Sequence, residues 1–434
     1  MLGTVLERIT GLFGRAFFIA ALLPIVLFLT ANAAAIGSCF GWSKLSGWWN
    51  DGLDEKSVQG ALLLVSVVAA SYLAMIVSPI LKRVAEGQYA LGWPGKRLRR
   101  RRIDSFNRAR AAVAASTSEL KAFREDFREF KKRLQLANNA RREPAEIAPS
   151  VTPQRKPVPP PENSTEIQEE LLAEASKSLA DIQCGVAPAS SQTLRPLAGK
   201  LEQLYMTPVP LAQIEPIHFA FTDLCNDTET AMEYRYSEAL GDMDSRFDRS
   251  SGVAGVRPTT LGNIIGAIWA YPFTRYGIDA VGAWPPLQHV IPEKYYPTVE
   301  DARISYDFAV MTAFLSGVFG VGWLGLGLWL WWNGTGCWPP PPGPFVATVA
   351  GVLGAIVMRL VAVEAARSFG AVFRTCFDLF RFDLLKKLSI PIPKNLEEER
   401  TAWSSLNQVL SYGDHSKNLV YEHSRVDKSS VSDA

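Results

Sequence analysis

The stretch Phe308–Trp332 reads FAVMTAFLSGVFGVGWLGLGLWLWW and contains no charged residue. A helix of about 20 apolar residues crosses the roughly 30 Å hydrocarbon core of a bilayer. In lipid, only helices and closed barrels satisfy the backbone hydrogen bonds, and this stretch is too long for a barrel strand. It therefore predicts a transmembrane helix. Three further runs have the same character: Ala16–Gly37, Gly60–Ile80 and Phe345–Val363.

The four runs form two pairs, and a long polar region separates the pairs. The predicted fold class is an all-α integral membrane protein, with four transmembrane helices in two hairpins and a mainly helical cytoplasmic region. The predicted segments are an N-terminal membrane hairpin (1–82), a polybasic segment with a heptad helix (83–142), a proline-rich linker (143–163), a helical cytoplasmic region (164–306), a C-terminal membrane hairpin (307–366), cytoplasmic juxtamembrane helices (367–412) and a disordered tail (413–434).

Basic residues predict the orientation, because Lys and Arg near the ends of spans stay on the cytoplasmic side. The second run is followed by the KRLRRRR stretch at 96–102. The loop 40–59 has more acidic than basic residues, and the loop 333–344 has no charge. Both loops also hold tryptophans, which favour the membrane interface. We therefore expect both termini and the region 83–306 in the cytoplasm.

The N-terminus leaves an alternative open. Arg8, Arg15, the first apolar run and the small residues at 31–33 also resemble a signal peptide with a cleavage site. The apolar run continues to Ile36, which favours an uncleaved span. In either case the second run passes from outside to inside, so the orientation of the remainder is the same.

The region 96–142 is strongly basic, with 16 Lys and Arg against 5 Asp and Glu. Basic residues directly inside a span attract anionic lipid headgroups by about 1 kcal/mol each. Nucleic acid would suit the same charges, but no aromatic interleaving and no recognised nucleic-acid fold accompanies them, so we expect no such partner. The residues expected to contact headgroups are Lys96, Arg97, Arg99, Arg100, Arg101 and Arg102.

Apolar residues recur at spacings of three and four over residues 106–137, without glycine or proline. This heptad pattern predicts a coiled coil between two copies of the chain, because acidic side chains at g would face basic side chains at e. The alternative is an amphipathic helix that packs on its own domain. The side chains concerned are Glu119 and Asp126 at g, and Arg124 and Lys131 at e.

The five cysteines fall on both sides of the membrane in this topology. Cys39 and Cys337 lie in the outer loops, where disulfides persist, and they either pair or remain two separate thiols. Cys184, Cys225 and Cys376 are expected in the cytoplasm. The spacing of cysteines and histidines fits no zinc site, so we expect no metal.

The membrane runs themselves favour packing over transport. Ala347 and Gly351, and likewise Ala350 and Gly354, are small residues four apart, which let helix backbones approach closely. Arg359 is the ionisable residue of the fourth run, and its side chain can reach the cytoplasmic interface.

No pattern in the chain predicts catalysis. The four histidines are scattered, and no phosphate-binding loop, nucleophile elbow or dinucleotide motif occurs. The acidic residues Asp242, Asp244 and Asp248 lack the glycine and the terminal glutamate of a calcium loop. We therefore expect no catalytic residue and no cofactor.

Two blocks of sequence flank the last hairpin: LGN…YP…RYGID…WP at 261–285 and FRFDLL…EEER…W at 380–403. They resemble blocks of a group of uncharacterised bacterial multi-span inner-membrane proteins. The resemblance covers residues 255–410 and departs from that pattern at Pro286, where a basic residue is commoner. It implies a multi-pass architecture in a bacterial inner membrane, and it implies no catalytic residue or ligand.

The two blocks are expected to meet beneath the hairpin. We expect a membrane-anchored scaffold or signalling module that presents its cytoplasmic helical region to a protein partner. An oligomeric channel and a membrane-tethered cytoplasmic enzyme are the alternatives. A turn is expected at Gly277, and Arg275 and Asp279, four residues apart, could form an ion pair across it. The expected partner surface comprises Arg275, Tyr276, Asp279, Trp284, Phe380, Arg381 and Asp383, although the same residues could simply brace the base of the hairpin.

Overall fold

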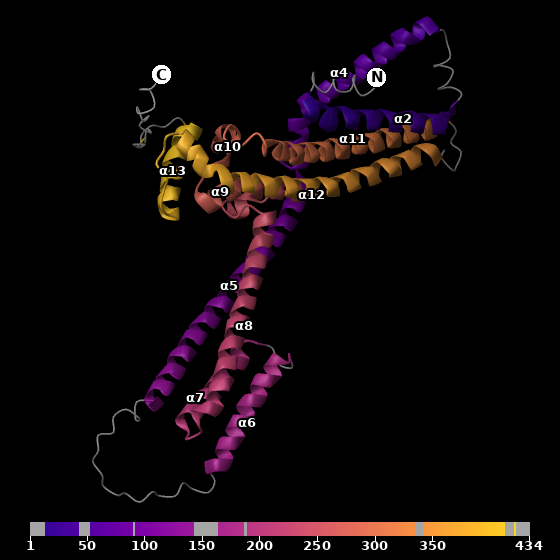
Figure 1. Cartoon of the computed structure of the whole chain (residues 1–434). Helices are drawn as coiled ribbons and strands as arrows, with labels where there is room; N and C mark the ends of the chain where they lie inside the picture. Colours follow the sequence, from indigo (N-terminus) through magenta and orange to yellow (C-terminus); the bar gives the residue numbers. More distant parts are fainter. Residues whose placement is uncertain are drawn as a thin grey trace, which may run out of the picture. The chain divides into compact units, whose positions relative to one another are not determined.

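The computed structural model describes residues 14–42, 53–89, 92–142, 164–185, 189–334, 342–412 and 421. These residues form helices joined by turns, and no strand occurs among them (Figure 1). The predicted linker at 143–163 and nearly all of the tail at 413–434 lie outside the described residues. The helices are η1 (Phe18–Leu22), α2 (Leu23–Phe40), α4 (Leu53–Ala85), α5 (Trp93–Arg142), α6 (Ser164–Gln183), α7 (Ser191–Met206), α8 (Leu211–Arg246), η3 (Gly252–Gly255), α9 (Thr260–Tyr276), α10 (Ala280–Gln288), α11 (Tyr296–Gly334), α12 (Pro342–Lys387) and α13 (Leu396–Tyr412).

The chain divides into two compact units. Unit 1 comprises Met1–Phe106 and Asp244–Ala434, and unit 2 comprises Asn107–Met243. The predicted scheme placed the heptad helix in a segment of its own and kept 164–306 together. The structure divides the chain differently because the apolar face of α5 is buried by helices that follow the predicted linker.

Four helices of unit 1 are long and apolar enough to cross a membrane. They contain the four predicted runs, which confirms those runs as helices of spanning length and composition. Helices α11 and α12 lie side by side along much of their length (Figure 1). The candidate spans are Gly14–Phe40, Leu62–Ala85, Tyr296–Asn333 and Pro342–Lys387.

Small residues set the close packing of α11 on α12, as their spacing predicted. A Cβ atom added at Gly351 would lie 2.6 Å from the backbone N and Cα of Gly320. A hydrogen bond joins α2 to α11, because the Trp323 Nε1–H donates to Asn32 Oδ1 over 3.2 Å. In lipid, where the hydrophobic effect gives helices little drive to associate, such close approach and such polar contacts hold helices together.

Unit 2 is a helical bundle with its own core. The heptad face of α5 packs against α6, α7 and α8. The buried residues of this core include Leu120, Phe123, Phe130 and Leu134 from α5, Leu179 from α6, Leu194, Leu201 and Leu204 from α7, and Ile214 and Phe221 from α8.

The charged side chains beside the heptad face are also used within the chain. Arg124 pairs with Glu229 of α8 at 2.7 Å. Asp126 accepts two hydrogen bonds from the Arg195 Nη2 group of α7, at 2.7 and 2.9 Å. These two residues were predicted to pair between copies of the chain. The structure supports the alternative, an amphipathic helix packed on its own domain, because the face from Leu120 onward and two of its four flanking charges are occupied within the chain.

A histidine lies between α7 and α8 in unit 2. The Tyr205 hydroxyl and His218 Nδ1 are 2.8 Å apart and share a hydrogen bond. Burial lowers the pKa of His218 below its ordinary value of 6.5. As the pH falls, the unfolded chain therefore takes up this proton before the folded chain does. The neutral His218 therefore makes its full contribution to the stability of unit 2 above about pH 6.5. This contribution is lost as the pH falls from there towards the lowered pKa of His218 in the folded state.

We expect the amides of α7 and α8 to be less protected from hydrogen exchange at about pH 5.5 than at about pH 7.5, after correction for intrinsic exchange rates. The His218→Gln variant should lose most of this pH dependence in the full-length protein. The exposed His289 lies in unit 1, so His289→Gln is the matched control. An unchanged pH dependence in His218→Gln would contradict the assignment.

Candidate functional site

The two sequence blocks meet in one hydrophobic core, as expected. Helices α9 and α10 carry the first block, and the end of α12 together with α13 carries the second (Figure 1). The Trp284 and Phe373 rings lie 4.7 Å apart between their centroids. Ile268, Phe377 and Trp403 are fully buried in the same cluster. The base of the C-terminal hairpin is thus a packed structure built from both blocks.

The RYGID motif forms the turn between α9 and α10. Gly277 has φ of 79°, a left-handed conformation that ends α9. Asp279 then caps α10 by accepting a hydrogen bond from the Val281 N–H over 3.1 Å. Asn407 of α13 holds this turn from the other side. Its Nδ2 donates to the Gly277 carbonyl at 2.7 Å, and its Oδ1 accepts from the Asp279 N–H at 2.9 Å.

The expected ion pair between Arg275 and Asp279 does not form in the described structure. The Asp279 carboxylate instead caps α10 and accepts a hydrogen bond from the Ser411 hydroxyl of α13. The turn at Gly277 is present, as the sequence predicts, and its left-handed conformation ends α9 between the two residues.

The Asp378 carboxylate of α12 accepts hydrogen bonds from two tyrosine hydroxyls. The Tyr271 hydroxyl donates to its carboxylate over 3.0 Å, and the Tyr276 hydroxyl over 2.7 Å. Burial and the hydrogen bond to this carboxylate raise the pKa of both tyrosines, so both phenols stay protonated donors. Asp378 was not among the predicted site residues, although it lies two positions before FRFDLL.

Arg381 is the centre of the contact between α12 and α13. Its guanidinium lies 4.1 Å from the centroid of the Tyr276 ring, and its Nε donates to Glu399 Oε1 over 2.7 Å. It also donates to the Asp378 backbone carbonyl. The Arg381 and Glu399 side chains are only 15% and 5% exposed. This is a buried ion pair with its hydrogen bonds largely satisfied.

The predicted partner surface is therefore mostly internal. Tyr276 is buried, while Asp279, Trp284, Phe380 and Arg381 are partly buried and each contacts another element of the base. Arg275 and Asp383 remain exposed. These placements support the alternative in which the residues brace the base of the hairpin.

Removing Glu399 would leave the Arg381 charge buried without its partner, which typically costs about 3–5 kcal/mol. We expect Glu399→Ala to lower the free energy of unfolding of the full-length protein by that order, measured by denaturant titration in detergent. Glu397 lies in the same first turn of α13 but is exposed. Glu397→Ala therefore controls for the loss of a helix-dipole contact. Equal losses in the two variants would show that the ion pair does not stabilise the base.

A second contact, missed by the sequence analysis, joins the two membrane hairpins. The chain after α4 passes directly over α9, and a Cβ atom on Gly262 would overlap the backbone carbonyl of Glu86. Arg257 Nη1 binds Glu86 Oε2 at 3.0 Å. Asn263 holds the Arg257 backbone, accepting from its N–H at 2.7 Å and donating to its carbonyl at 2.9 Å. Lys82 and Asp307 add an ion pair at 2.6 Å.

Gly262→Ala should separate α9 from the end of α4 and destabilise unit 1, because overpacking typically costs about 1–3 kcal/mol and here the obstacle is backbone. Gly266 lies on the same helix, and a Cβ there would meet nothing closer than 3.9 Å. Gly266→Ala should be neutral or slightly stabilising through helix propensity. Thermal unfolding of both full-length variants in the same detergent measures the difference. Similar midpoints for the two would contradict the close contact.

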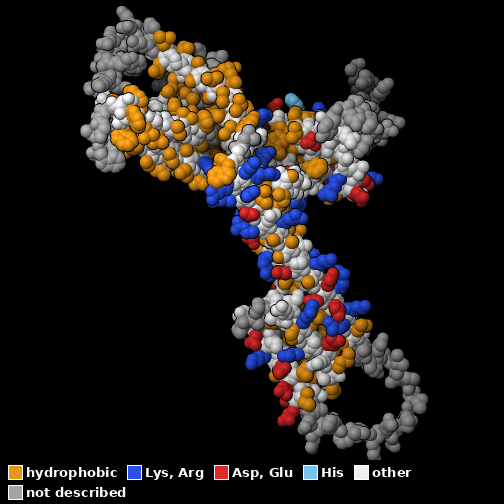
Figure 2. All heavy atoms as spheres, turned by 180° about the vertical axis from the view of Figure 1, so that it is seen from behind, with side chains coloured by type: hydrophobic (Ala, Val, Ile, Leu, Met, Phe, Trp, Pro, Cys, Tyr) orange, Lys and Arg blue, Asp and Glu red, His pale blue; other side chains and the backbone are white. Residues whose placement is uncertain are grey.

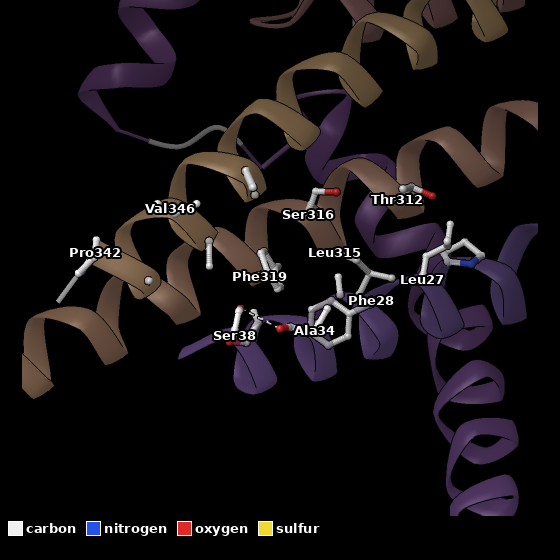
Figure 3. Close-up of a pocket in the computed structure, with 17 residues that line it drawn as sticks. Leu27, Phe28, Ala34, Ser38, Thr312, Leu315, Ser316, Phe319, Pro342 and Val346 are labelled. Atoms are coloured by element: carbon white, nitrogen blue, oxygen red, sulfur yellow. Dashed lines mark hydrogen bonds between the residues drawn. The ribbon is translucent and has the colours of Figure 1, made fainter. Parts of the chain in front are cut away.

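An apolar groove of about 670 Å³ lies between α2, α11 and α12 within the candidate spans (Figure 3). Its polar side chains are the hydroxyls of Ser38, Thr312 and Ser316, and the Ser38 hydroxyl donates to the Ala34 carbonyl at 2.9 Å. No ionisable side chain lines it among the described residues.

The polybasic stretch lies on the first turns of α5. Its side chains are exposed at Lys96, Arg97, Arg99, Arg100 and Arg101, and partly buried at Arg102. Arg97 lies over the Trp93 ring at 5.5 Å. Arg99 donates to the carbonyls of Val256 and Ala254, at 2.9 and 3.1 Å. Figure 2 shows Lys and Arg side chains gathered where the apolar surface ends.

Among the described residues, no group of three or more His, Cys, Asp and Glu side chains could hold a metal ion. Burial raises the pKa of the Cys225 thiol to about 12, so it is not a nucleophile at neutral pH. Cys39 has a free thiol, and the predicted bridge to Cys337 involves a residue outside the described ranges. Comparison with protein-family models, curated proteins and solved structures gives no match.

Proposed function

We propose that this protein is a membrane-anchored scaffold that presents unit 2 to a protein partner in the cytoplasm. The observation that carries the proposal is the division of the chain. All four candidate spans belong to unit 1, whereas unit 2 has its own core and contains none of them. Helices α5 and α8 each belong to both units, so unit 2 is held at two points of the chain.

The base of the C-terminal hairpin supports an anchoring role. Residues of the two sequence blocks, such as Arg381 and Glu399, hold α9, α10, α12 and α13 together. The contact between Arg257 and Glu86 joins the first hairpin to the second. A rigid membrane platform of this kind suits a protein that positions another module. In this proposal the platform lies in a bacterial inner membrane, with both termini on the cytoplasmic side, as the basic residues and the two sequence blocks suggest.

The partner surface is proposed on unit 2 rather than at the base. Met206 and Phe219 are both 69% exposed. They directly follow Tyr205 and His218, whose side chains share a hydrogen bond, so they belong to the neighbouring stretches of α7 and α8. Exposed large apolar side chains are candidates for contact with a partner. Self-association through the heptad face of α5 would be restricted to the part before Leu120, because the face from Leu120 onward is covered by unit 2 itself.

The tagged full-length protein, purified from native membranes in mild detergent, tests the proposal. We expect a soluble protein to co-purify in constant ratio, and the double variant Met206→Ser, Phe219→Ser to reduce its capture at least tenfold. Arg275→Ala, an exposed change at the base, is the control and should leave capture unchanged. If only Arg275→Ala lost capture, the partner surface would lie at the base of the C-terminal hairpin and not on unit 2. Absence of any stoichiometric partner would contradict the scaffold function.

A further inference from the structure

The apolar groove between α2, α11 and α12 is long and narrow. Its lining follows α2 from Pro24 to Ser38, which is about 21 Å at 1.5 Å per residue. Figure 3 shows Thr312 towards one end of the groove and Pro342 towards the other. The length corresponds to about two-thirds of a hydrocarbon core of roughly 30 Å. The shape therefore suits an elongated ligand that lies along the spans.

The width of the groove decides between a helix and a single chain as its occupant. A volume of about 670 Å³ over this length gives a mean cross-section of about 32 Å². A helix with its side chains is about 10–12 Å across, which is roughly 80–110 Å² in section. A helix from a second copy could therefore lie over the groove but could not fill it. An unbranched hydrocarbon chain, a single row of methylene groups, is narrow enough to enter.

The walls of the groove suit hydrocarbon. Ala31, Ala34 and Ala350 line it and are exposed, so small side chains create the space. An ordered water needs two to four polar partners, whereas most of this lining is apolar. An unfilled space in a bilayer would lose dispersion contacts along its whole wall. At the depth of the candidate spans, lipid acyl chains are the molecules at hand to fill it.

One hydroxyl of the lining has a donor to offer. The Thr312 Oγ1 atom is buried and makes no hydrogen bond within the described ranges. By contrast, the Ser38 and Thr348 hydroxyls donate to carbonyls of the preceding turn, as is common in helices. A buried hydroxyl without a partner destabilises the fold, so an acceptor beside Thr312 is favoured. Thr312 lies about 6 Å inside the start of the predicted run at Phe308, close to the depth of lipid ester groups.

We propose that the groove binds one acyl chain of a membrane phospholipid, whose ester carbonyl accepts a hydrogen bond from the Thr312 hydroxyl. The chain fills the space between α2 and the C-terminal hairpin, and it completes the packing of the first span on the third and fourth. The inference rests on the proposed membrane insertion of unit 1 but not on the scaffold function.

The test uses the full-length protein in liposomes of phosphatidylethanolamine and phosphatidylglycerol. A phosphatidylethanolamine with a diazirine in the middle of one palmitoyl chain is the probe, and mass spectrometry locates the label after irradiation. We expect several times more label on the groove residues of α2 and α11 than on α4. Residues 62–65 of α4 are 53–64% exposed and measure random contact with lipid. Equal labelling of α4 and the groove would overturn the site.

A larger side chain at the edge of the groove should block it. Ala34→Leu should reduce labelling of the groove about tenfold, because the added carbons overlap the chain. Ala33 is exposed but does not line the groove. Ala33→Leu is therefore the matched control and should leave the labelling unchanged. Equal labelling in the two variants would contradict the proposal. A changed oligomeric state in Ala34→Leu with unchanged labelling would instead assign the groove to a second copy.

A second variant separates a lost contact from a damaged fold. Thr312→Val keeps the shape of the side chain but removes the hydroxyl. It should weaken competition by an ester-linked phospholipid against the probe about fivefold, since one hydrogen bond is lost. Competition by the ether-linked analogue, which has no carbonyl, should stay the same. Equal weakening of both lipids would overturn the hydrogen bond to the ester. None of these results bears on capture of a partner by unit 2.

Discussion

The close approach of Glu86 to Gly262 is the constraint on which the arrangement of unit 1 depends. Only glycine fits at position 262, because a Cβ atom there would overlap the Glu86 carbonyl. The end of the first hairpin therefore lies directly against α9. The ion pair between Arg257 and Glu86, and the Asn263 hydrogen bonds that hold Arg257, then fix the direction of approach. The start of α5 follows within a few residues, so its position is set by the same contact.

The two units are packed in different ways. Unit 2 buries leucines and phenylalanines from four helices, and its surface charges pair across helices. In unit 1, α11 and α12 approach closely at small residues such as Gly351 on Gly320, the kind of contact that holds helices together in lipid. The base of the C-terminal hairpin buries aromatic residues and an ion pair.

The features that could be predicted from the sequence are those that depend on the length of an apolar run or on the spacing of apolar residues along a helix. The four apolar runs were recognised because a bilayer demands a fixed length of helix, and the heptad face was placed correctly on α5. Periodicity does not say what covers a face, so Arg124 and Asp126 were assigned to a second copy of the chain although they bind α8 and α7. The turn at Gly277 in the RYGID block was predicted, but the ion pair between Arg275 and Asp279 across it does not form, because the Asp279 carboxylate caps α10 instead. The role of Glu86 could not be seen, because its partners lie far away in the sequence.

That distance has a consequence for how the protein is made. Glu86 and Arg257 are 171 positions apart. A ribosome adding about 5–20 residues per second therefore needs on the order of ten seconds or more to supply the second partner. During this interval the surface that receives the end of the first hairpin does not yet exist. Unit 2 is synthesised in full before Arg257, since it ends at Met243. The contact between Glu86 and Arg257 can therefore form only after the whole of unit 2 is available to fold.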